Sequence, residues 1–113
     1  MKRKKKKGYV YLISGTETPN LYKIGVTRGD INKRIKKLQT GNPGELWTVK
    51  YYETDYPFFL EKQLHFRLRA RKVYGEWFDL PIADALNFEN MCNQIEGMIE
   101  GLKDNEFFMK NLK

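Results

Sequence analysis

Two short stretches near the start of the chain alternate apolar and polar residues as β-strands do. They cover residues 9–13 (YVYLI) and 21–27 (LYKIGVT), and the turn-rich segment 15–20 between them predicts an antiparallel hairpin. Because side chains alternate across a strand, one face of the hairpin takes the core residues, with Tyr22 pointing inward. The other face presents two phenols, an amine, a glycine and a hydroxyl: Tyr9, Tyr11, Lys23, Gly25 and Thr27.

Helical periodicity begins after Asp30, which suits the N-cap position, and ends at Gly41. Arg34 borders the apolar stripe of this helix instead of lying opposite it. The elements expected next are a strand over 46–54, a helix from Pro57 to about Arg71, a short extended piece at 77–80 and a helix from Ile82 to about Leu102. The order strand, strand, helix, strand, helix, helix predicts a small α+β domain in which helices flank a three-stranded antiparallel sheet.

Length and charge refine this picture. The 113 residues allow one domain, and a hydrophobic fraction of 41% excludes disorder of the whole chain. The net charge of +7 is uneven: residues 2–7 (KRKKKK) carry +6, residues 8–78 carry +5 and residues 79–113 carry −4. We therefore expect a disordered basic tail over 1–7, a folded domain over 8–80, and a C-terminal helix within 81–113 that packs on the same domain.

Some classes of protein are excluded by what the sequence contains. One cysteine, Cys92, cannot form an intrachain disulfide, and a single histidine, His65, excludes the common Cys/His zinc sites. The apolar run after the basic tail is shorter than a signal peptide requires, and no segment approaches the length of a membrane span. We expect an intracellular, cytoplasmic protein without a membrane partner, or a nuclear one if the host is eukaryotic.

Glu61 breaks the pattern of the second predicted helix. At about 100° per residue it falls inside the apolar arc that contains Leu60 and Leu64, and His65 lies beside it. An uncompensated buried charge costs several kcal/mol, so this carboxylate must be paired, protonated or bound to a metal. A buried ion pair with His65 or Arg34 is one alternative, and a metal site is another.

These motifs, in this order, resemble the GIY-YIG nuclease superfamily. The resemblance rests on Tyr9-Val10-Tyr11, Lys23-Ile24-Gly25, Arg34, the run 38–43 (LQTGNP), Leu60-Glu61 with His65, and Glu76-Trp77-Phe78. It covers about residues 8–80. The Gln-Thr-Gly-Asn-Pro and Glu-Trp-Phe signatures point to the branch known from a bacteriophage T5 open reading frame and a meiotically up-regulated fungal gene.

The resemblance implies hydrolysis of DNA phosphodiester bonds with one divalent cation, Mg²⁺ or Mn²⁺. It assigns the site to Tyr11, Lys23, Arg34 and Glu61, with Glu61 as metal ligand; Tyr9, Tyr22, His65 and Glu76 are secondary candidates. The residue types suit the reaction, because a carboxylate is a hard ligand for Mg²⁺ and a guanidinium can clamp phosphate oxygens. Tyr11 is the candidate general base; a free phenol is a weak base at neutral pH, and Lys23 on the same face would favour the phenolate.

The partner expected from the charge distribution is duplex DNA. Basic residues of the two central helices would bind it: Lys33, Lys36, Lys37, Arg67 and Arg71. The sequence has no separate recognition module, so strong specificity would require a dimer or a partner protein. Lys23 stands where the second motif usually has tyrosine, and this departure motivates the alternative of a catalytically inactive DNA-binding or structural module. An RNA nuclease is a third possibility.

Overall fold

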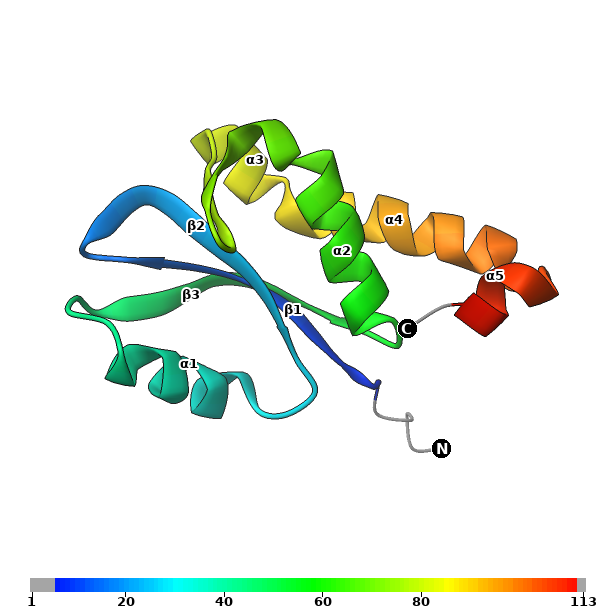
Figure 1. Cartoon of the computed structure of the whole chain (residues 1–113), viewed down its shortest axis with the longest axis horizontal. Coiled ribbons are helices and arrows are strands. Elements are labelled where there is room, and N and C mark those ends of the chain that lie inside the picture. The colour runs from blue at the N-terminus through cyan, green and yellow to red at the C-terminus, as the bar shows by residue number, and fades with distance from the viewer. Residues whose placement is uncertain (1–5, 112–113) are drawn as a thin grey trace.

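A five-stranded antiparallel sheet with helices on both faces forms the domain in a computed structural model, which describes residues 6–111 (Figure 1). The strands, in sheet order β3-β1-β2-β5-β4, are β1 (Gly8–Gly15), β2 (Thr18–Thr27), β3 (Leu46–Thr54), β4 (Lys72–Tyr74) and β5 (Trp77–Asp79). The helices are α1 (Ile31–Thr40), α2 (Pro57–Arg67), α3 (Ile82–Leu86), α4 (Phe88–Leu102) and α5 (Glu106–Asn111), with a 3₁₀ turn at Arg69–Arg71. The predicted α+β class is confirmed.

The prediction of three strands is wrong. The extended piece at Trp77–Asp79 adds to the edge of β2, and β4 pairs with β5 beyond it. Gly75 adopts a φ of +52° in the turn between them, a conformation that glycine tolerates without strain. The sequence indicated the extended piece that forms β5 but neither its pairing nor β4, because strands of three residues are too short to show a period of two.

Two predicted helices differ from the observed ones. The helix expected to reach Arg71 ends at Arg67, because the chain turns at Leu68 towards the edge of the sheet. The helix expected over 82–102 is divided at Asn87 into α3 and α4. In α3 the large apolar residues Ile82 and Leu86 are exposed and only Ala85 reaches the core, whereas α4 starts with the fully buried Phe88 and supplies most of the helical core contacts.

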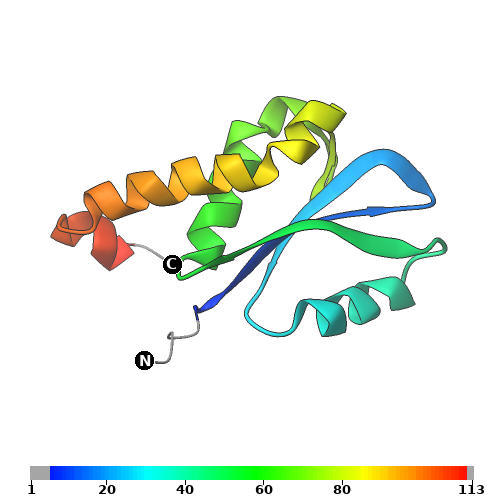
Figure 2. The same cartoon turned by 180° about the vertical axis from the view of Figure 1, so that it is seen from behind.

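The sheet separates two hydrophobic cores, of which the alternation in the hairpin predicts only the first. Val10 and Leu12 pack with α2 and α4, and so does Tyr22, which points inward as expected. Tyr11 and Ile13 lie on the opposite face under α1. Figure 1 and its rear view in Figure 2 show α1 alone on this face and α2 and α4 together on the other. Helix α1 thus covers the part of this face that contains Tyr11, which is fully buried, and leaves Tyr9 partly exposed.

Polar contacts join α4 to β3. Thr54 donates a 2.6 Å hydrogen bond to Glu96, and the Tyr52 hydroxyl lies 2.8 Å from the same carboxylate. Burial, followed by this bond, raises the pKa of Tyr52 and keeps its hydroxyl a donor. Cys92, on the buried side of α4, has its pKa raised to about 12, chiefly by burial, so it remains a thiol packed in the core. The C-terminal helix therefore completes the main core.

The predicted basic tail covers residues 1–7, of which the structure describes only Lys6 and Lys7. The basic tail falls largely on residues 1–5, outside the described residues; the backbone N–H groups of Lys6 and Lys7 donate to Glu53 and Asp55. None of the helices formed by residues 6–111 combines the length and the apolar character that a membrane span requires.

Candidate functional site

Two of the predicted site residues, Lys23 and Glu61, come together beside β2 where its pairing with β5 ends. The last paired residue of β2 is Lys23, opposite Trp77. At the next position the Ile24 N–H donates to the Glu76 carbonyl at 3.1 Å, and the Ile24 carbonyl lies 2.9 Å from His65 Nε2. Since a carbonyl can only accept, this contact places the ring hydrogen on Nε2 and leaves the lone pair on Nδ1. The Ile24 carbonyl of β2 is thus bonded by a side chain of α2 instead of by a neighbouring strand.

Glu61, His65 and Glu76 form a cluster at this edge. Glu61 and His65 are one turn apart on α2, and Glu76 comes from the turn between β4 and β5. One potential ligand atom of each residue lies within 4.8 Å of the others. Glu76 also forms a 2.9 Å ion pair with Lys23, which brings that residue to the cluster from β2. Two secondary candidates of the sequence, His65 and Glu76, are thus central to the site.

The Glu61 carboxylate has an unusual environment. Its Oε2 is buried and accepts no hydrogen bond within the part of the chain that the structure describes. Burial raises the pKa of Glu61 to about 7, the negative charge of Glu76 adds to this, and Lys23 offsets part of it. Among residues 6–111, neither His65 nor Arg34 forms an ion pair with Glu61. The structure therefore does not support the alternative of a buried ion pair.

This donor set fits a divalent cation. Mg²⁺ is usually held by one or two carboxylates together with waters and substrate phosphate, and Mn²⁺ takes the same oxygen ligands. Glu61 and Glu76 supply the two carboxylates, His65 an imidazole, and the buried Glu61 oxygen lacks another partner. A cation between these residues would replace the proton that burial otherwise favours on Glu61.

We predict that Glu61→Gln stabilises the metal-free protein at alkaline pH. A carboxyl whose pKa is raised by folding stabilises the fold fully below its unfolded pKa of 4.5, and loses this contribution as the pH rises through about 7. Glutamine mimics the protonated form at every pH. Because Glu61 is only half-buried, we expect a gain of about 1 kcal/mol near pH ~8 and almost none near pH ~4.5. Urea unfolding in EDTA measures both, and an equal effect at the two pH values would contradict the prediction.

Tyr11 and Arg34 meet on the α1 face of the sheet. Arg34 Nε donates to the Tyr11 oxygen at 3.3 Å, and this bond is the main reason that the pKa of Arg34 is raised, so the guanidinium stays charged. The negative charge of Glu76 raises the pKa of Arg34 slightly further. The sequence predicts Lys23 as the cation that favours the Tyr11 phenolate; the structure places Arg34 at the phenol oxygen and pairs Lys23 with Glu76.

Gly25 makes room for the Tyr11 ring. The two residues are opposite each other in the β1–β2 register, and a Cβ on Gly25 would lie 2.6 Å from Tyr11 Cε1 and still closer to Cζ and the hydroxyl oxygen. Tyr11 has no exposed surface, so its ring has little space in which to move. The glycine of the second motif is therefore required by packing.

We predict that Gly25→Ala lowers the free energy of unfolding by about 1 to 3 kcal/mol, the usual cost of overpacking a core. Gly97→Ala on α4 is the matched control: no atom lies within 4 Å of its added Cβ, and alanine favours a helix, so we expect it to be neutral or stabilising. Urea unfolding measures both variants. Equal stability of Gly25→Ala and the wild type would show that the Tyr11 ring is not fixed as described.

The structure does not bring all predicted residues together. Tyr9 lies beside Tyr51, and Tyr22 is in the main core. Lys33, Lys36 and Lys37 are exposed on α1. Arg67, by contrast, donates to Gln94 of α4 at 3.0 Å, and Arg71 is exposed on the 3₁₀ turn after α2. The lysines and the arginines thus belong to elements on opposite sides of the sheet (Figure 2).

Tyr51 is a residue that the sequence analysis missed. It pairs with Tyr11 in the β1–β3 register, so it extends the same face of the sheet. The alternation of side chains along residues 46–54 could have shown which face of that strand Tyr51 occupies. It could not have shown that Tyr51 lies opposite Tyr11, because the register between β1 and β3 is not encoded locally.

Comparisons with known proteins give one finding. The model of the T5orf172 domain matches residues 8–109, from the start of β1 into α5. The match therefore extends past residue 80, where the motifs in the sequence end. No curated protein and no solved structure gives a significant match.

Proposed function

Because the chain belongs to the T5orf172 domain family, which is associated with a GIY-YIG-like nuclease fold, we propose that it is a small Mg²⁺-dependent endonuclease that hydrolyses DNA phosphodiester bonds. One observation carries the proposal: Glu61, whose buried Oε2 accepts no hydrogen bond within the described chain, has a carboxylate oxygen within 4.8 Å of ligand atoms of Glu76 and His65. Such an arrangement is costly for folding and suits a cation, which is typical of a functional site.

Glu61, His65 and Glu76 would hold Mg²⁺ or Mn²⁺. When bound, the cation supplies positive charge for the phosphate and the leaving oxygen. The Lys23 ion pair, at 2.9 Å, orients the Glu76 carboxylate towards the cluster. Lys23 is in this view a positioning residue. The bond between His65 and the Ile24 carbonyl, together with an edge contact of its ring on Phe78, fixes the imidazole at the edge of the sheet.

Arg34 binds the scissile phosphate in this proposal. Its Nε is occupied by the Tyr11 oxygen, which leaves the two terminal NH₂ groups for phosphate oxygens. Tyr11 is the proposed general base for the attacking water, and its oxygen accepts the 3.3 Å hydrogen bond of Arg34 Nε. Lys33, Lys36 and Lys37 lie exposed on the same helix as Arg34, so duplex DNA would run along α1.

A non-catalytic DNA-binding module is the second candidate, and the Lys23–Glu76 ion pair favours it. The pair neutralises one of the two carboxylates, and a raised pKa of about 7 allows Glu61 to hold a proton at neutral pH. The cluster can therefore exist without a cation. Under this alternative the protein would bind DNA through α1 and leave it intact.

Incubation with supercoiled plasmid DNA separates the two functions. Nicking in Mg²⁺ or Mn²⁺ that EDTA abolishes would support the endonuclease. Binding of DNA in a mobility shift, with no nicking in either metal, would contradict it and support the module. A duplex and a single-stranded RNA of matched sequence, offered under the same conditions, test the RNA alternative: preferential cleavage of RNA would overturn DNA as the substrate.

A further inference from the structure

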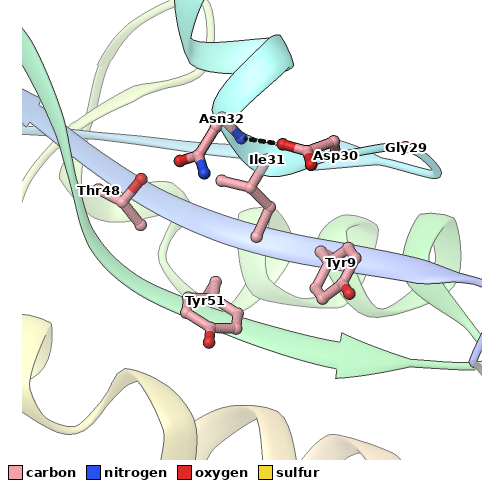
Figure 3. A pocket seen from close by; sticks show the side chains of 7 residues that line it. All are labelled: Tyr9, Gly29, Asp30, Ile31, Asn32, Thr48 and Tyr51. Atoms are coloured by element: carbon pink, nitrogen blue, oxygen red, sulfur yellow. Dashed lines mark hydrogen bonds between the residues drawn. The ribbon is translucent and has the colours of Figure 1, made fainter.

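An open pocket of about 350 Å³ lies between the sheet and the start of α1 (Figure 3). Tyr9 from β1 and Thr48 and Tyr51 from β3 line one side of it, and Asp30, Ile31 and Asn32 line the other. In Figure 3 the two tyrosine rings stand beside each other, and the Asn32 side chain extends on the side of Thr48. The pocket is separate from the Glu61 cluster, and nothing in the proposed reaction uses it.

The pocket adjoins the Tyr11–Arg34 pair. Tyr51 is directly opposite Tyr11 in the β1–β3 register, so their Cβ atoms are about 5 Å apart. Tyr9 precedes Tyr11 by two residues on the same face of β1, a distance of about 7 Å along the strand. Arg34 follows Ile31 by one turn of α1. A phosphate at Arg34 would therefore place the neighbouring part of its nucleotide within reach of the pocket.

The lining offers flat apolar surfaces together with available polar groups. The rings of Tyr9 and Tyr51 meet edge to face with centroids 5.9 Å apart, and Tyr51 keeps 56% of its surface exposed. The Asn32 amide, the Thr48 hydroxyl and both phenols have no hydrogen-bond partner within residues 6–111. Asp30, in contrast, is engaged, because it accepts from the backbone N–H groups of Asn32 and Lys33 at the start of α1.

From this juxtaposition we propose that the pocket binds an unpaired nucleobase of the bound DNA, next to the phosphate held by Arg34. A base matches both features of the lining, since its face can pack on a tyrosine ring and its edge can bond to an amide and a hydroxyl. A base inside a duplex is stacked and paired, so only one that is unpaired or turned out of the helix can enter. The inference rests on the proposed function and adds to it a preference for DNA with an unpaired nucleotide beside the cleaved bond.

Binding of end-labelled duplexes in EDTA tests the pocket. One duplex carries a single unpaired adenine, and a second carries an abasic nucleotide at the same bulge. We expect the wild type to bind the adenine bulge about tenfold more tightly, a typical effect for one stacked base. Tyr51→Ala should abolish this preference, and Tyr51→Phe, which keeps the ring, should retain most of it.

Tyr74→Ala is the matched control. Tyr74 is also a tyrosine on an edge strand with 54% of its surface exposed, but β4 lies at the other edge of the sheet from β3. Its removal should leave the preference for the adenine bulge unchanged. Equal affinity of the wild type for the two bulges, or a preference that survives Tyr51→Ala, would overturn the inference.

This experiment is independent of cleavage. Because it is performed in EDTA on uncut DNA, a failure of metal-dependent nicking would overturn the nuclease proposal and leave the binding result in place. Conversely, a protein that nicks DNA but does not distinguish the two bulges would retain the nuclease proposal and overturn the pocket as a base site.

Discussion

Glu61→Gln is expected to reduce DNA nicking by about 10³-fold or more while the fold is kept. The amide removes the negative charge that makes the buried oxygen a good ligand, and a bound cation typically supplies several kcal/mol of transition-state stabilisation. The loss cannot be attributed to unfolding, because the same variant is expected to be more stable than the wild type near pH ~8. Single-turnover nicking of supercoiled plasmid in excess Mg²⁺ measures the effect.

Glu100→Gln is the control for the loss of a carboxylate. Glu100 is exposed on α4 and pairs only with Lys103 among the ion pairs of the described residues. Its substitution should leave the nicking rate within about twofold, since a surface ion pair contributes little. Nicking by Glu61→Gln at the rate of the wild type would remove Glu61 from the site.

The second large effect is expected for Tyr11→Phe, which should slow nicking by about 10² to 10⁴-fold, the usual contribution of a positioned base. Phenylalanine keeps the buried ring over Gly25 and removes only the oxygen that accepts from Arg34. The loss of that one hydrogen bond should cost about 1 kcal/mol of stability. The rate at saturating DNA and urea unfolding measure the two effects separately.

Tyr52→Phe provides the same change on the other face of the sheet. The Tyr52 hydroxyl bonds to Glu96 of α4, so its removal should lower stability by about 1 to 3 kcal/mol and leave nicking within about twofold. If both variants slow nicking equally, the effect of Tyr11→Phe reflects general loosening of the fold. A Tyr11→Phe protein with the rate of the wild type would remove Tyr11 from the role of base.

The local elements could be predicted because their signals are local. Asp30 caps α1 as expected, β3 covers residues 46–54 as expected, and the alternation of Val10 and Tyr11 correctly assigned the two faces of β1. What the pattern did not show is that both faces are covered. The sequence alternates in the same way whether a phenol is buried under a helix or exposed on an open sheet. The burial of Tyr11 could therefore be seen only in the structure.

The site was predictable only in part. The position of Glu61 in an apolar arc identified a carboxylate in an unfavourable environment. Burial in that environment is the main reason that the pKa of Glu61 is raised. The contribution of Glu76 depends on the β4–β5 turn, whose strands are too short to be recognised by periodicity. The sequence pointed to Lys23 as the cation beside the Tyr11 oxygen, whereas the structure places Arg34 there, because this contact depends on the distance between α1 and the sheet.

The metal centre is tested most directly by the proton NMR signals of the His65 ring in the untagged protein. His65 is the only histidine of the chain, so these signals need no assignment by mutation. If Glu61, His65 and Glu76 hold a divalent cation, Mn²⁺ added below one equivalent should broaden the His65 signals in the wild type, and Glu61→Gln should remove this effect. His65 signals that stay sharp at Mn²⁺ concentrations well above one equivalent, or that broaden equally in Glu61→Gln, would contradict a metal centre at this edge of the sheet.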